Sequence, residues 1–272
     1  MGDPEQIFGK KSTILITGAS SGIGAALALH LASYGARLAL MARRHDRLEQ
    51  VAQDVKEAGG QPLILVGDVT DLNAVAEAHR KVLEGFGPVS VAFLNAGVGG
   101  ETRVDDFSAA EVKTIFDVNV MGIANWLEVL LPSMLEQKEA RLVAISSLAG
   151  ARGLPGSAAY CGSKAAVSAM LESLQVDTVK RELKISIVEP GFVRSEITAR
   201  NKFPMPFIMD GESAARVICD GVAEGQPWIR FPWPLAAAVR VLRYLPAGLY
   251  KHVGGSLAGQ RSPKRADEGN EP

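Results

Sequence analysis

Tyr160 and Lys164 stand four residues apart in a stretch whose apolar residues recur at helical spacing. A helix there would place both side chains on one face, one turn apart. An isolated phenol titrates near ~10, and a neighbouring ammonium group favours the phenolate. The pair therefore predicts a general acid–base group in which Lys164 lowers the pKa of Tyr160. The spacing alone also occurs by chance, so this interpretation depends on what lies nearby.

Two polar positions accompany this pair. Ser147 ends an expected strand thirteen residues before Tyr160, which would bring its hydroxyl group to the same edge of the sheet. Ser146 is a rival for this role, and only the spacing favours Ser147. Asn119 falls in an expected helix among apolar neighbours, where a side-chain amide must find hydrogen-bond partners. By itself it would be a structural residue.

A glycine-rich turn, 17–24, follows the first expected strand and leads directly into a helix. A dinucleotide pyrophosphate site requires this context, because free N–H groups at the helix start bind the phosphates. Gly18 lets the chain turn, Gly22 lets the backbone approach the phosphates, and Gly24 allows close helix packing. The order Gly-x-x-x-Gly-x-Gly differs from Gly-x-Gly-x-x-Gly. Cofactor contacts are predicted for Gly18, Ser20, Ser21, Gly22, Ile23 and Gly24.

The second expected strand ends in Arg43 and Arg44, and no acid stands at its tip. An acid there would bind the adenosine ribose of NAD, whereas a guanidinium group can clamp the 2′-phosphate of NADP. The pattern favours NADP over NAD, with Arg43 as the clamp and Arg44 adding positive field. The alternative is that both arginines are solvated residues at the start of the next helix.

Two further strand ends offer ligand contacts. Asp68, which is followed by Val69, would accept a hydrogen bond from the adenine amino group, or it would cap the next helix instead. The small residues Asn95, Ala96 and Gly97 leave room for a ligand against the backbone. All of these positions are expected at one edge of the sheet.

Short β-branched runs alternate with longer segments of helical periodicity, which is the pattern of βαβ units on a parallel sheet. The runs are apolar nearly throughout, as expected for strands covered on both faces. We predict an α/β fold with a doubly wound parallel sheet flanked by helices, in a single domain over 12–255. The expected strands are 12–17, 36–42, 62–67, 89–95, 141–147 and 184–189. The expected helices are 22–33, 46–58, 72–86, 112–135 and 158–182.

The composition excludes several classes of protein. The 272 residues are 47% hydrophobic and 22% charged, which excludes a disordered or fibrous chain. With 29 basic and 30 acidic residues, nucleic acid is not an expected partner. Two cysteines and four scattered histidines predict neither a disulfide framework nor a metal site. No export signal or spanning stretch is visible, so a cytoplasmic location is expected.

Together these residues resemble the short-chain dehydrogenase/reductase family, single-domain type, over about residues 12–195. The resemblance implies a Rossmann-like fold, a nicotinamide cofactor and an alcohol/carbonyl redox reaction. It also implies a homodimer or homotetramer that pairs the two long helices, 112–135 and 158–182. The motifs that carry it are 17–24, Asp68, 95–97, Asn119, Ser147, Tyr160, Lys164 and 190–191.

The resemblance assigns roles to individual residues. In the reducing direction Ser147 donates to the carbonyl oxygen and Tyr160 delivers the proton, while hydride comes from the nicotinamide. Lys164 also holds the nicotinamide ribose, and Asn119 keeps a water that relays protons to Lys164. One departure is Ser195, which stands where the family often has Thr. The residues implied to contact the nicotinamide side of the cofactor are Tyr160, Lys164, Pro190, Gly191, Val193 and Ser195.

The prediction is an NADP(H)-dependent oxidoreductase that interconverts a carbonyl and an alcohol on a hydrophobic small molecule. A redox-inactive NADP-binding sensor is the alternative. A lyase or epimerase is disfavoured, because no extra acid or base stands out near Asn119, Ser147, Tyr160 and Lys164. The bulky apolar segment 190–210 is expected to be a lid over the substrate, with Phe192 and Phe203 in contact with it, or to pack onto the body of the protein.

The two ends of the chain differ from this centre. Residues 1–11 are a polar N-terminal extension, and residues 256–272 are expected to be a disordered tail. Residues 228–255 form an apolar and basic extension, in which Arg240 and Arg243 interrupt apolar residues at helical spacing. Three interpretations stand for it: a helix packed on the body or on a partner, a cover for the substrate entrance, or peripheral membrane contact through 234–250.

Overall fold

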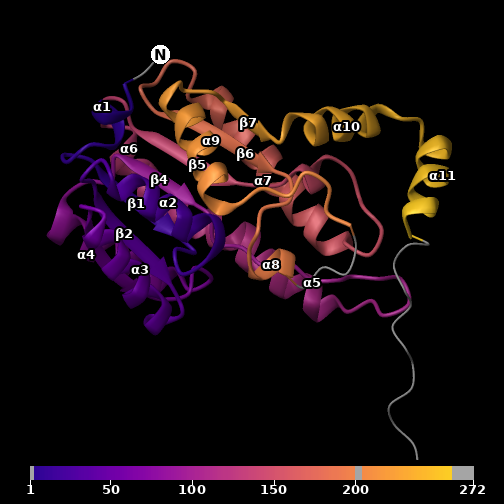
Figure 1. The fold of residues 1–272 in the computed structure, drawn as a ribbon, viewed down its shortest axis with the longest axis horizontal. Coiled ribbons are helices and arrows are strands. Elements are labelled where there is room, and N and C mark those ends of the chain that lie inside the picture. Colours follow the sequence, from indigo (N-terminus) through magenta and orange to yellow (C-terminus); the bar gives the residue numbers. More distant parts are fainter. Residues whose placement is uncertain (1–2, 200–203, 259–272) are drawn as a thin grey trace, which may run out of the picture.

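A computed structural model describes residues 3–199 and 204–258 of the chain. Seven parallel strands form one sheet in the order β3-β2-β1-β4-β5-β6-β7 (Figure 1). The predicted α/β fold, a doubly wound parallel sheet in a single domain, is confirmed. The strands are β1 (Thr13–Thr17), β2 (Arg37–Ala42), β3 (Gln61–Val66), β4 (Val91–Leu94), β5 (Arg141–Ile145), β6 (Lys184–Pro190) and β7 (Trp228–Phe231).

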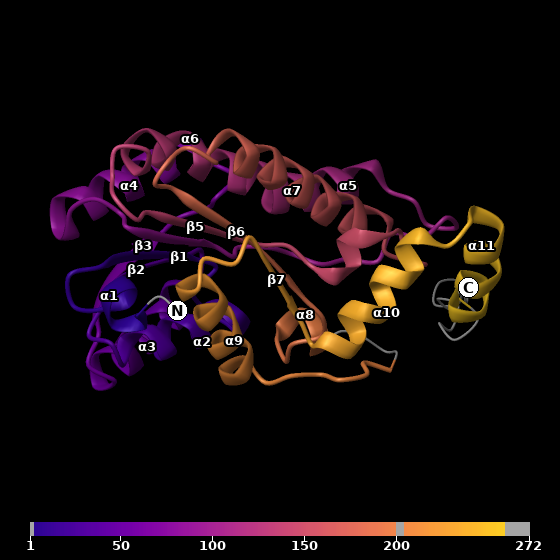
Figure 2. The ribbon, with the colours of Figure 1, turned by 90° about the horizontal axis from the view of Figure 1, so that it is seen from above.

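Helices cover both faces of the sheet (Figure 2). One layer contains α4, α6 and α7, and the opposite layer contains α2, α3 and α9. The helices are α1 (Pro4–Phe8), α2 (Gly22–Ala32), α3 (His45–Glu57), α4 (Leu72–Phe86), α5 (Ala109–Phe116), α6 (Gly122–Met134), α7 (Ala158–Asp177), α8 (Glu196–Ala199), α9 (Gly211–Ala223), α10 (Trp233–Tyr244) and α11 (Ala247–Ala258). A π-helical turn, η1 (Asp117–Met121), and a 3-10 turn, η2 (Leu148–Ala151), complete them.

Each central strand is apolar because it packs on two layers. All residues of β1, β4 and β5 are buried, and their side chains alternate between two apolar cores. The N-terminal extension contributes to one of these cores, because Phe8 of α1 is fully buried. The polar appearance of residues 1–11 conceals this anchor.

Several boundaries differ from those predicted. The helix expected over 112–135 is three consecutive elements, α5, η1 and α6, and it begins at Ala109. In the described part of the chain, 109–134 is the run whose length and apolarity would suffice to cross a membrane. Its residues Trp126 and Leu130 are buried in the core between α6 and the sheet, which accounts for the apolar composition. Within this protein the run is a core helix.

The C-terminal third holds the largest differences. Helix α7 ends at Asp177 rather than at residue 182, and Val176 and Val179 near its end are exposed to solvent. Helix α9 and strand β7 were not predicted. Residues 228–231, assigned to the C-terminal extension, are the edge strand β7 of the sheet, and 256–258 continue α11 instead of starting a disordered tail.

Candidate active site

Helix α7 carries Tyr160 and Lys164 on one face, as their spacing predicts. Lys164 is 4% exposed, and its Nζ donates a hydrogen bond of 2.8 Å to the carbonyl oxygen of Ile145, the last residue of β5. The same Nζ lies 5.9 Å from the centre of the Tyr160 ring. The lysine therefore reaches along its helix into the edge of the sheet, beside the phenol.

The electrostatics of this pair differ from the expectation. Burial raises the pKa of Tyr160, and hydrogen bonding with the Ser147 side chain only partly opposes that effect. Burial also lowers the pKa of Lys164 to about 8, because a charged ammonium group loses its hydration there. Both side chains are thus pushed toward their neutral forms.

The two serines after β5 have separate functions. Ser147 caps η2, where its Oγ accepts a hydrogen bond of 3.1 Å from the N–H of Ala149, and it lies on the side of Tyr160. Ser146 is 2% exposed and its hydroxyl donates to the carbonyl oxygen of Lys164 at 2.9 Å. Since Ser146 is held inside the structure, the geometry favours Ser147 as the hydroxyl at the site.

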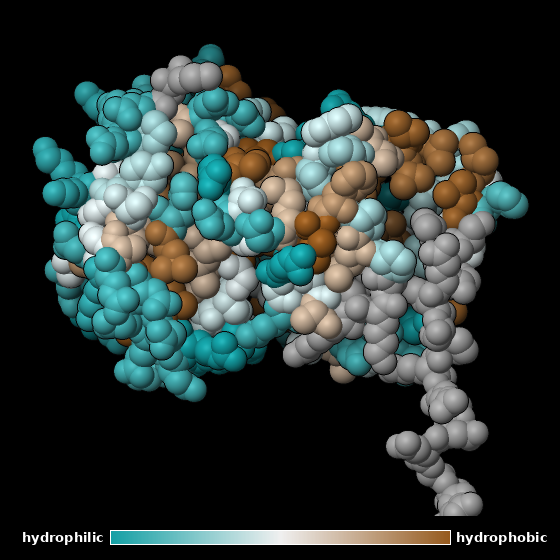
Figure 3. Space-filling model, in the orientation of Figure 1, coloured by the Kyte–Doolittle hydropathy of each residue, from teal (hydrophilic) through white to brown (hydrophobic). Residues whose placement is uncertain are grey.

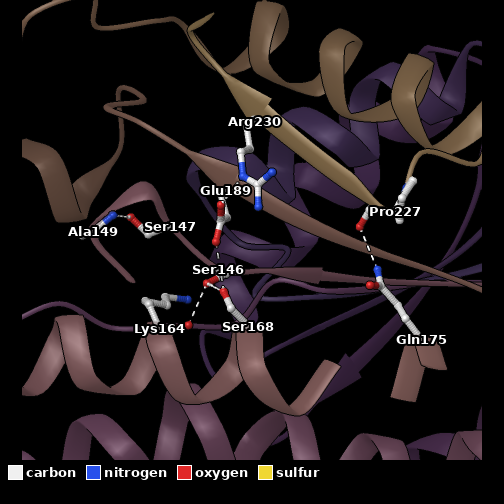
Figure 4. Close-up of polar contacts among 9 residues, drawn as sticks. All are labelled: Ser146, Ser147, Ala149, Lys164, Ser168, Gln175, Glu189, Pro227 and Arg230. Atoms are coloured by element: carbon white, nitrogen blue, oxygen red, sulfur yellow. Dashed lines mark hydrogen bonds and ion pairs between the residues drawn. The ribbon is translucent and has the colours of Figure 1, made fainter. Parts of the chain in front are cut away.

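Ser146 opens a chain of buried polar contacts that leads away from the site (Figure 4). Its Oγ lies 2.8 Å from the hydroxyl of Ser168, which donates to Oε1 of Glu189 at 3.2 Å. Oε2 of Glu189 accepts a hydrogen bond of 2.6 Å from Nε of Arg230. The contacts join α7, β5, β6 and β7, so the backbone at Lys164 is tied to the edge strand of the sheet.

Asn119 lies in the π-helical turn η1 and is fully buried. Its Oδ1 accepts a hydrogen bond from the N–H of Val98 at 2.8 Å, and its Nδ2 donates to the Val98 carbonyl and to the Ser163 hydroxyl, both at 3.0 Å. A Cβ at Gly97 would lie 3.3 Å from Oδ1 of Asn119 and 3.5 Å from Nζ of Lys164. Asn119 thereby holds the loop after β4 beside the lysine. Together, Asn119, Ser147, Tyr160 and Lys164 are here called the catalytic cluster.

The glycine-rich turn has the backbone geometry that its sequence predicts. Gly18 and Gly22 have φ of 66° and 56°, a region that other residues rarely adopt. A Cβ at Gly24 would lie 2.3 Å from the carbonyl oxygen of Gly18, so close packing requires glycine there. Asn95 fastens this turn, because its Nδ2 donates to the carbonyl oxygens of Thr17 and Gly18 at 2.9 and 3.3 Å. The side chain of Asn95 is thus a structural support, next to the small residue Ala96.

Both arginines after β2 are paired with carboxylates. The Nη1 of Arg44 donates to both carboxylate oxygens of Glu196 at 2.9 and 2.7 Å, and its Nη2 donates to the hydroxyls of Ser20 and Ser21 at 3.2 and 3.0 Å. A longer ion pair of 3.6 Å joins Arg43 to Asp68. These arginines, here called the basic rim, lie at the glycine-rich turn, and Arg44 rather than Arg43 makes the contacts to it.

Asp68 holds its own loop as well as Arg43. Its Oδ1 accepts hydrogen bonds from the N–H and the hydroxyl of Thr70 at 3.0 and 2.9 Å. Partial burial on its own would raise the pKa of Asp68, but the hydrogen bonds from Thr70 and the charge of Arg43 outweigh it and lower the pKa. The next residue, Val69, is buried against Gly122 at the start of α6. The cap of α4 is Asp71, whose side chain accepts from two N–H groups.

The segment after β6 folds back over the glycine-rich turn. Val193 pairs with Met209, which closes the base of the segment, and the Cβ of Ser195 lies 3.1 Å from the position of a Cβ at Gly22. Phe192 is half-buried at the start of the segment. Phe203, expected at the substrate, lies outside the described residues.

Gly191, next to Pro190, has a structural reason of its own. A Cβ there would lie 2.7 Å from Cδ2 of Leu235, so glycine allows α10 to pack on the end of β6. Ile23, which was predicted to contact the cofactor, is half-buried in the first turn of α2.

Three contributors to the site were not predicted from the sequence. Glu196 is the acid paired with Arg44, Ser163 holds Asn119, and Glu189 ends the polar chain from Ser146. The position of Ser163 three residues after Tyr160 was an available signal, because residues at this spacing share a helix face. The pairing of Glu196 with Arg44 spans 152 residues and leaves no local pattern.

A family profile described as short chain dehydrogenase matches residues 12–204. The chain is 41% identical over 238 residues to an uncharacterized oxidoreductase of Myxococcus xanthus, a match that covers 88% of this chain and 94% of that protein. The range of the family profile includes every residue of the catalytic cluster and of the basic rim.

Solved structures agree with these matches. A short chain dehydrogenase/reductase from Burkholderia phymatum, in complex with NAD, has a TM-score of 0.81 and 28% identity, covering 96% of this chain and 99% of that one. An alcohol dehydrogenase from the archaeon Thermococcus sibiricus, complexed with 5-hydroxy-NADP, has a TM-score of 0.71 and 30% identity, covering 78% of this chain and 90% of that one. The similar structures therefore include one with NAD and one with a derivative of NADP.

Proposed function

This chain belongs to the short-chain dehydrogenase family and is an NAD(P)-dependent oxidoreductase acting on CH–OH groups, and we propose that it uses NADP(H) on a hydrophobic carbonyl or alcohol. The observation that carries the proposal is the catalytic cluster, in which a buried lysine lies beside a tyrosine whose pKa is raised by burial. This arrangement suits proton transfer to a carbonyl oxygen.

The residues at the glycine-rich turn fit a dinucleotide. Gly18 and Gly22 give the turn its positive φ angles, and α2 begins at Gly22 with N–H groups available for phosphates. Two guanidinium groups, Arg43 and Arg44, stand where a 2′-phosphate would need positive charge, which supports NADP. When bound, the nicotinamide supplies or accepts the hydride.

The side chains of the cluster would divide the remaining work. The Oη of Tyr160 holds the proton for the carbonyl oxygen, and the Oγ of Ser147 donates a second hydrogen bond to that oxygen. The Nζ of Lys164 has one donor committed to Ile145, which leaves two for the ribose hydroxyls assigned to it by family resemblance. The amide of Asn119 is committed to Val98 and Ser163, so this residue would act by holding the loop after β4 beside Lys164. Its water relay stays a prediction.

The substrate class is inferred from the apolar surroundings of the site. Exposed Ile197 and Phe207 lie in the segment that covers the cofactor turn, near Phe192 in the chain. An open surface hollow of about 380 Å³ between the loop before α7 and α11 is lined by Leu154, Pro155 and Tyr250, among others. These residues support a lipophilic ketone, aldehyde or alcohol as the substrate. A cytoplasmic homodimer or homotetramer is part of the proposal.

Titration of the protein with NADPH and NADH, followed by fluorescence, tests the cofactor. The same sample, mixed with a panel of hydrophobic ketones and aldehydes, is then followed at the absorbance of the reduced nicotinamide. Tighter NADPH binding with turnover of a lipophilic carbonyl is expected, and Arg43→Ala should weaken NADPH far more than NADH. Preference for NADH would contradict the role of the basic rim. Tight binding without turnover in either direction would favour the sensor instead.

A further inference from the structure

Helix α10 is apolar on two opposite sides. Leu235, Val239 and Leu242 are half-buried and lie toward the body, where Leu235 packs over Gly191. The outer side presents Trp233 and Tyr244, which are 78% and 77% exposed. Apolar side chains on two sides of a helix need cover on each side, and among residues 3–199 and 204–258 the structure provides it on the inner side only.

Exposed residues on the outer side of α10 recur at helical spacing. Ala237, Arg240 and Val241 lie between the two aromatic residues at the three- and four-residue spacing that places them on one face, and all three are exposed. Arg243 borders this face. Figure 3 shows hydrophobic residues gathered over α10 and α11, at the end of the molecule away from α3 and α4. The residues Trp233, Ala237, Arg240, Val241, Arg243 and Tyr244 are here called the α10 face.

The α10 face is held in place by the body of the protein. The Nη1 of Arg152 donates to the carbonyl oxygens of Leu242, Arg243 and Leu245, at 2.5 to 3.0 Å, and so caps the C-terminus of α10. The guanidinium group of Arg152 also lies 3.9 Å from the centre of the Tyr250 ring on α11. These contacts hold the turn between α10 and α11, so the exposed side chains of α10 have a defined position on the surface.

The charge of this end of the chain differs from that of the rest. From residue 225 to 266 there are seven lysines and arginines and no aspartate or glutamate. The remainder of the chain holds 22 basic and 30 acidic residues. A chain with a net charge of −1 thus has a positive excess in the stretch of sequence that contains α10.

We propose that the α10 face docks on the surface of a membrane rich in anionic phospholipids. Trp233 and Tyr244 would lie at the level of the headgroups with Val241 below them, while Arg240 and Arg243 bind the anionic headgroups. A second copy is a poorer fit. A two-fold contact would place the arginines of one face against those of the other, with no carboxylate on α10 or α11 to neutralise them. The inference does not depend on the cofactor or the substrate.

Sedimentation of the full chain with vesicles tests this surface. The vesicles contain phosphatidylcholine alone or with roughly 30 mol % phosphatidylserine, in about 0.1 M and about 0.5 M NaCl. We expect binding to the phosphatidylserine vesicles at low salt only. Arg240→Glu with Arg243→Glu should lower the partition coefficient about tenfold or more. Trp233→Ser with Tyr244→Ser should lower it as well, through loss of apolar burial.

Matched variants at the far end of the molecule serve as controls. Leu72→Ser with Leu83→Ser removes exposed apolar residues from α4, and Arg47→Glu with Lys56→Glu reverses exposed charges on α3. Both should bind vesicles as the native chain does. If the glutamate variant does not fold, by thermal unfolding, Arg240→Gln with Arg243→Gln replaces it.

Three results would overturn the proposal. The first is failure of the native chain to bind phosphatidylserine vesicles, and the second is equal binding to vesicles of phosphatidylcholine alone. The third is a lower mass for Trp233→Ser with Tyr244→Ser than for the native chain, measured by light scattering without vesicles. The α10 face would then be an interface between copies. An unchanged mass for this variant, together with its loss of vesicle binding, supports the proposal.

Discussion

The catalytic cluster and the basic rim lie at the same edge of the sheet but are built in different ways. Lys164 and Asn119 are buried, each is held by backbone carbonyls, and the ionised form of the lysine is disfavoured. Arg43 and Arg44 are largely exposed and each is paired with a carboxylate, Asp68 or Glu196. Burial makes single contacts strong, whereas solvent screens the contacts of the rim.

This difference predicts large effects in the cluster and small ones at the rim. A buried polar group that loses its partner costs free energy, because water cannot replace the partner. An exposed ion pair contributes little, so its residues remain available for a ligand. The cluster is therefore suited to fixed geometry, and the rim is suited to exchange of partners when a phosphate arrives.

The largest effect is expected at the tyrosine. Tyr160→Phe removes the proton donor and leaves the ring, so kcat should fall about a thousandfold while NADPH binding is kept. Steady-state kinetics together with fluorescence titration measure both. A variant that stays active would show that the proton comes from another group. The contrast between the catalytic cluster and the basic rim would then not hold.

The second prediction concerns the free energy of burying the Lys164 ammonium group. Lys164→Met removes an ammonium group whose pKa is lowered to about 8, so at pH 7 the variant should be more stable by about 2 kcal/mol, after allowance for the lost hydrogen bond to Ile145. Activity should be lost. Urea unfolding at pH 7 measures the gain.

The same group predicts a pH dependence with a definite sign. The folded pKa is below the unfolded value of 10.5, so the unfolded chain binds more protons between pH 8 and 10.5. The stability of the native chain, relative to Lys164→Met, should therefore rise with pH across that window. A difference between the two that does not change with pH would show that Lys164 titrates normally.

An intermediate effect is expected in the polar chain behind the site. Glu189→Gln keeps the shape but removes the charge that pairs with Arg230, so the free energy of unfolding should fall by about 1–2 kcal/mol. Chemical denaturation measures it. Ser168→Ala is the matched control and should cost about 1 kcal/mol or less. NADPH affinity should stay the same in both variants. A change would mean that the polar contacts from Ser146 to Arg230 influence the basic rim.

The smallest effect is expected at the rim. Glu196→Gln frees Arg44 from its carboxylate, so NADPH should bind about threefold to tenfold more tightly while NADH binding stays the same. Isothermal titration with both cofactors measures the ratio. Equal tightening of NADH would mean that Glu196 acts by closing the segment over the turn and not by occupying the arginine.

The sequence was sufficient where the signal is local. The glycine-rich turn requires positive φ at Gly18 and Gly22 whatever surrounds it, and the spacing of Tyr160 and Lys164 places them on one helix face. Buried strands were recognisable because both faces of the sheet are covered. These features of the fold and the site depend on neighbours along the chain, so they could be predicted.

Tertiary structure decided what depends on partners far apart in the chain. The spacing favoured Ser147 over Ser146, but the pairing of Arg44 with Glu196 and the edge strand β7 depend on contacts that no spacing reveals. The pKa of Tyr160 belongs to the same group: the adjacent lysine suggested a lower value, and burial raises it. Desolvation and long-range pairing are properties of the packed chain, since each requires that distant residues exclude water from the same place.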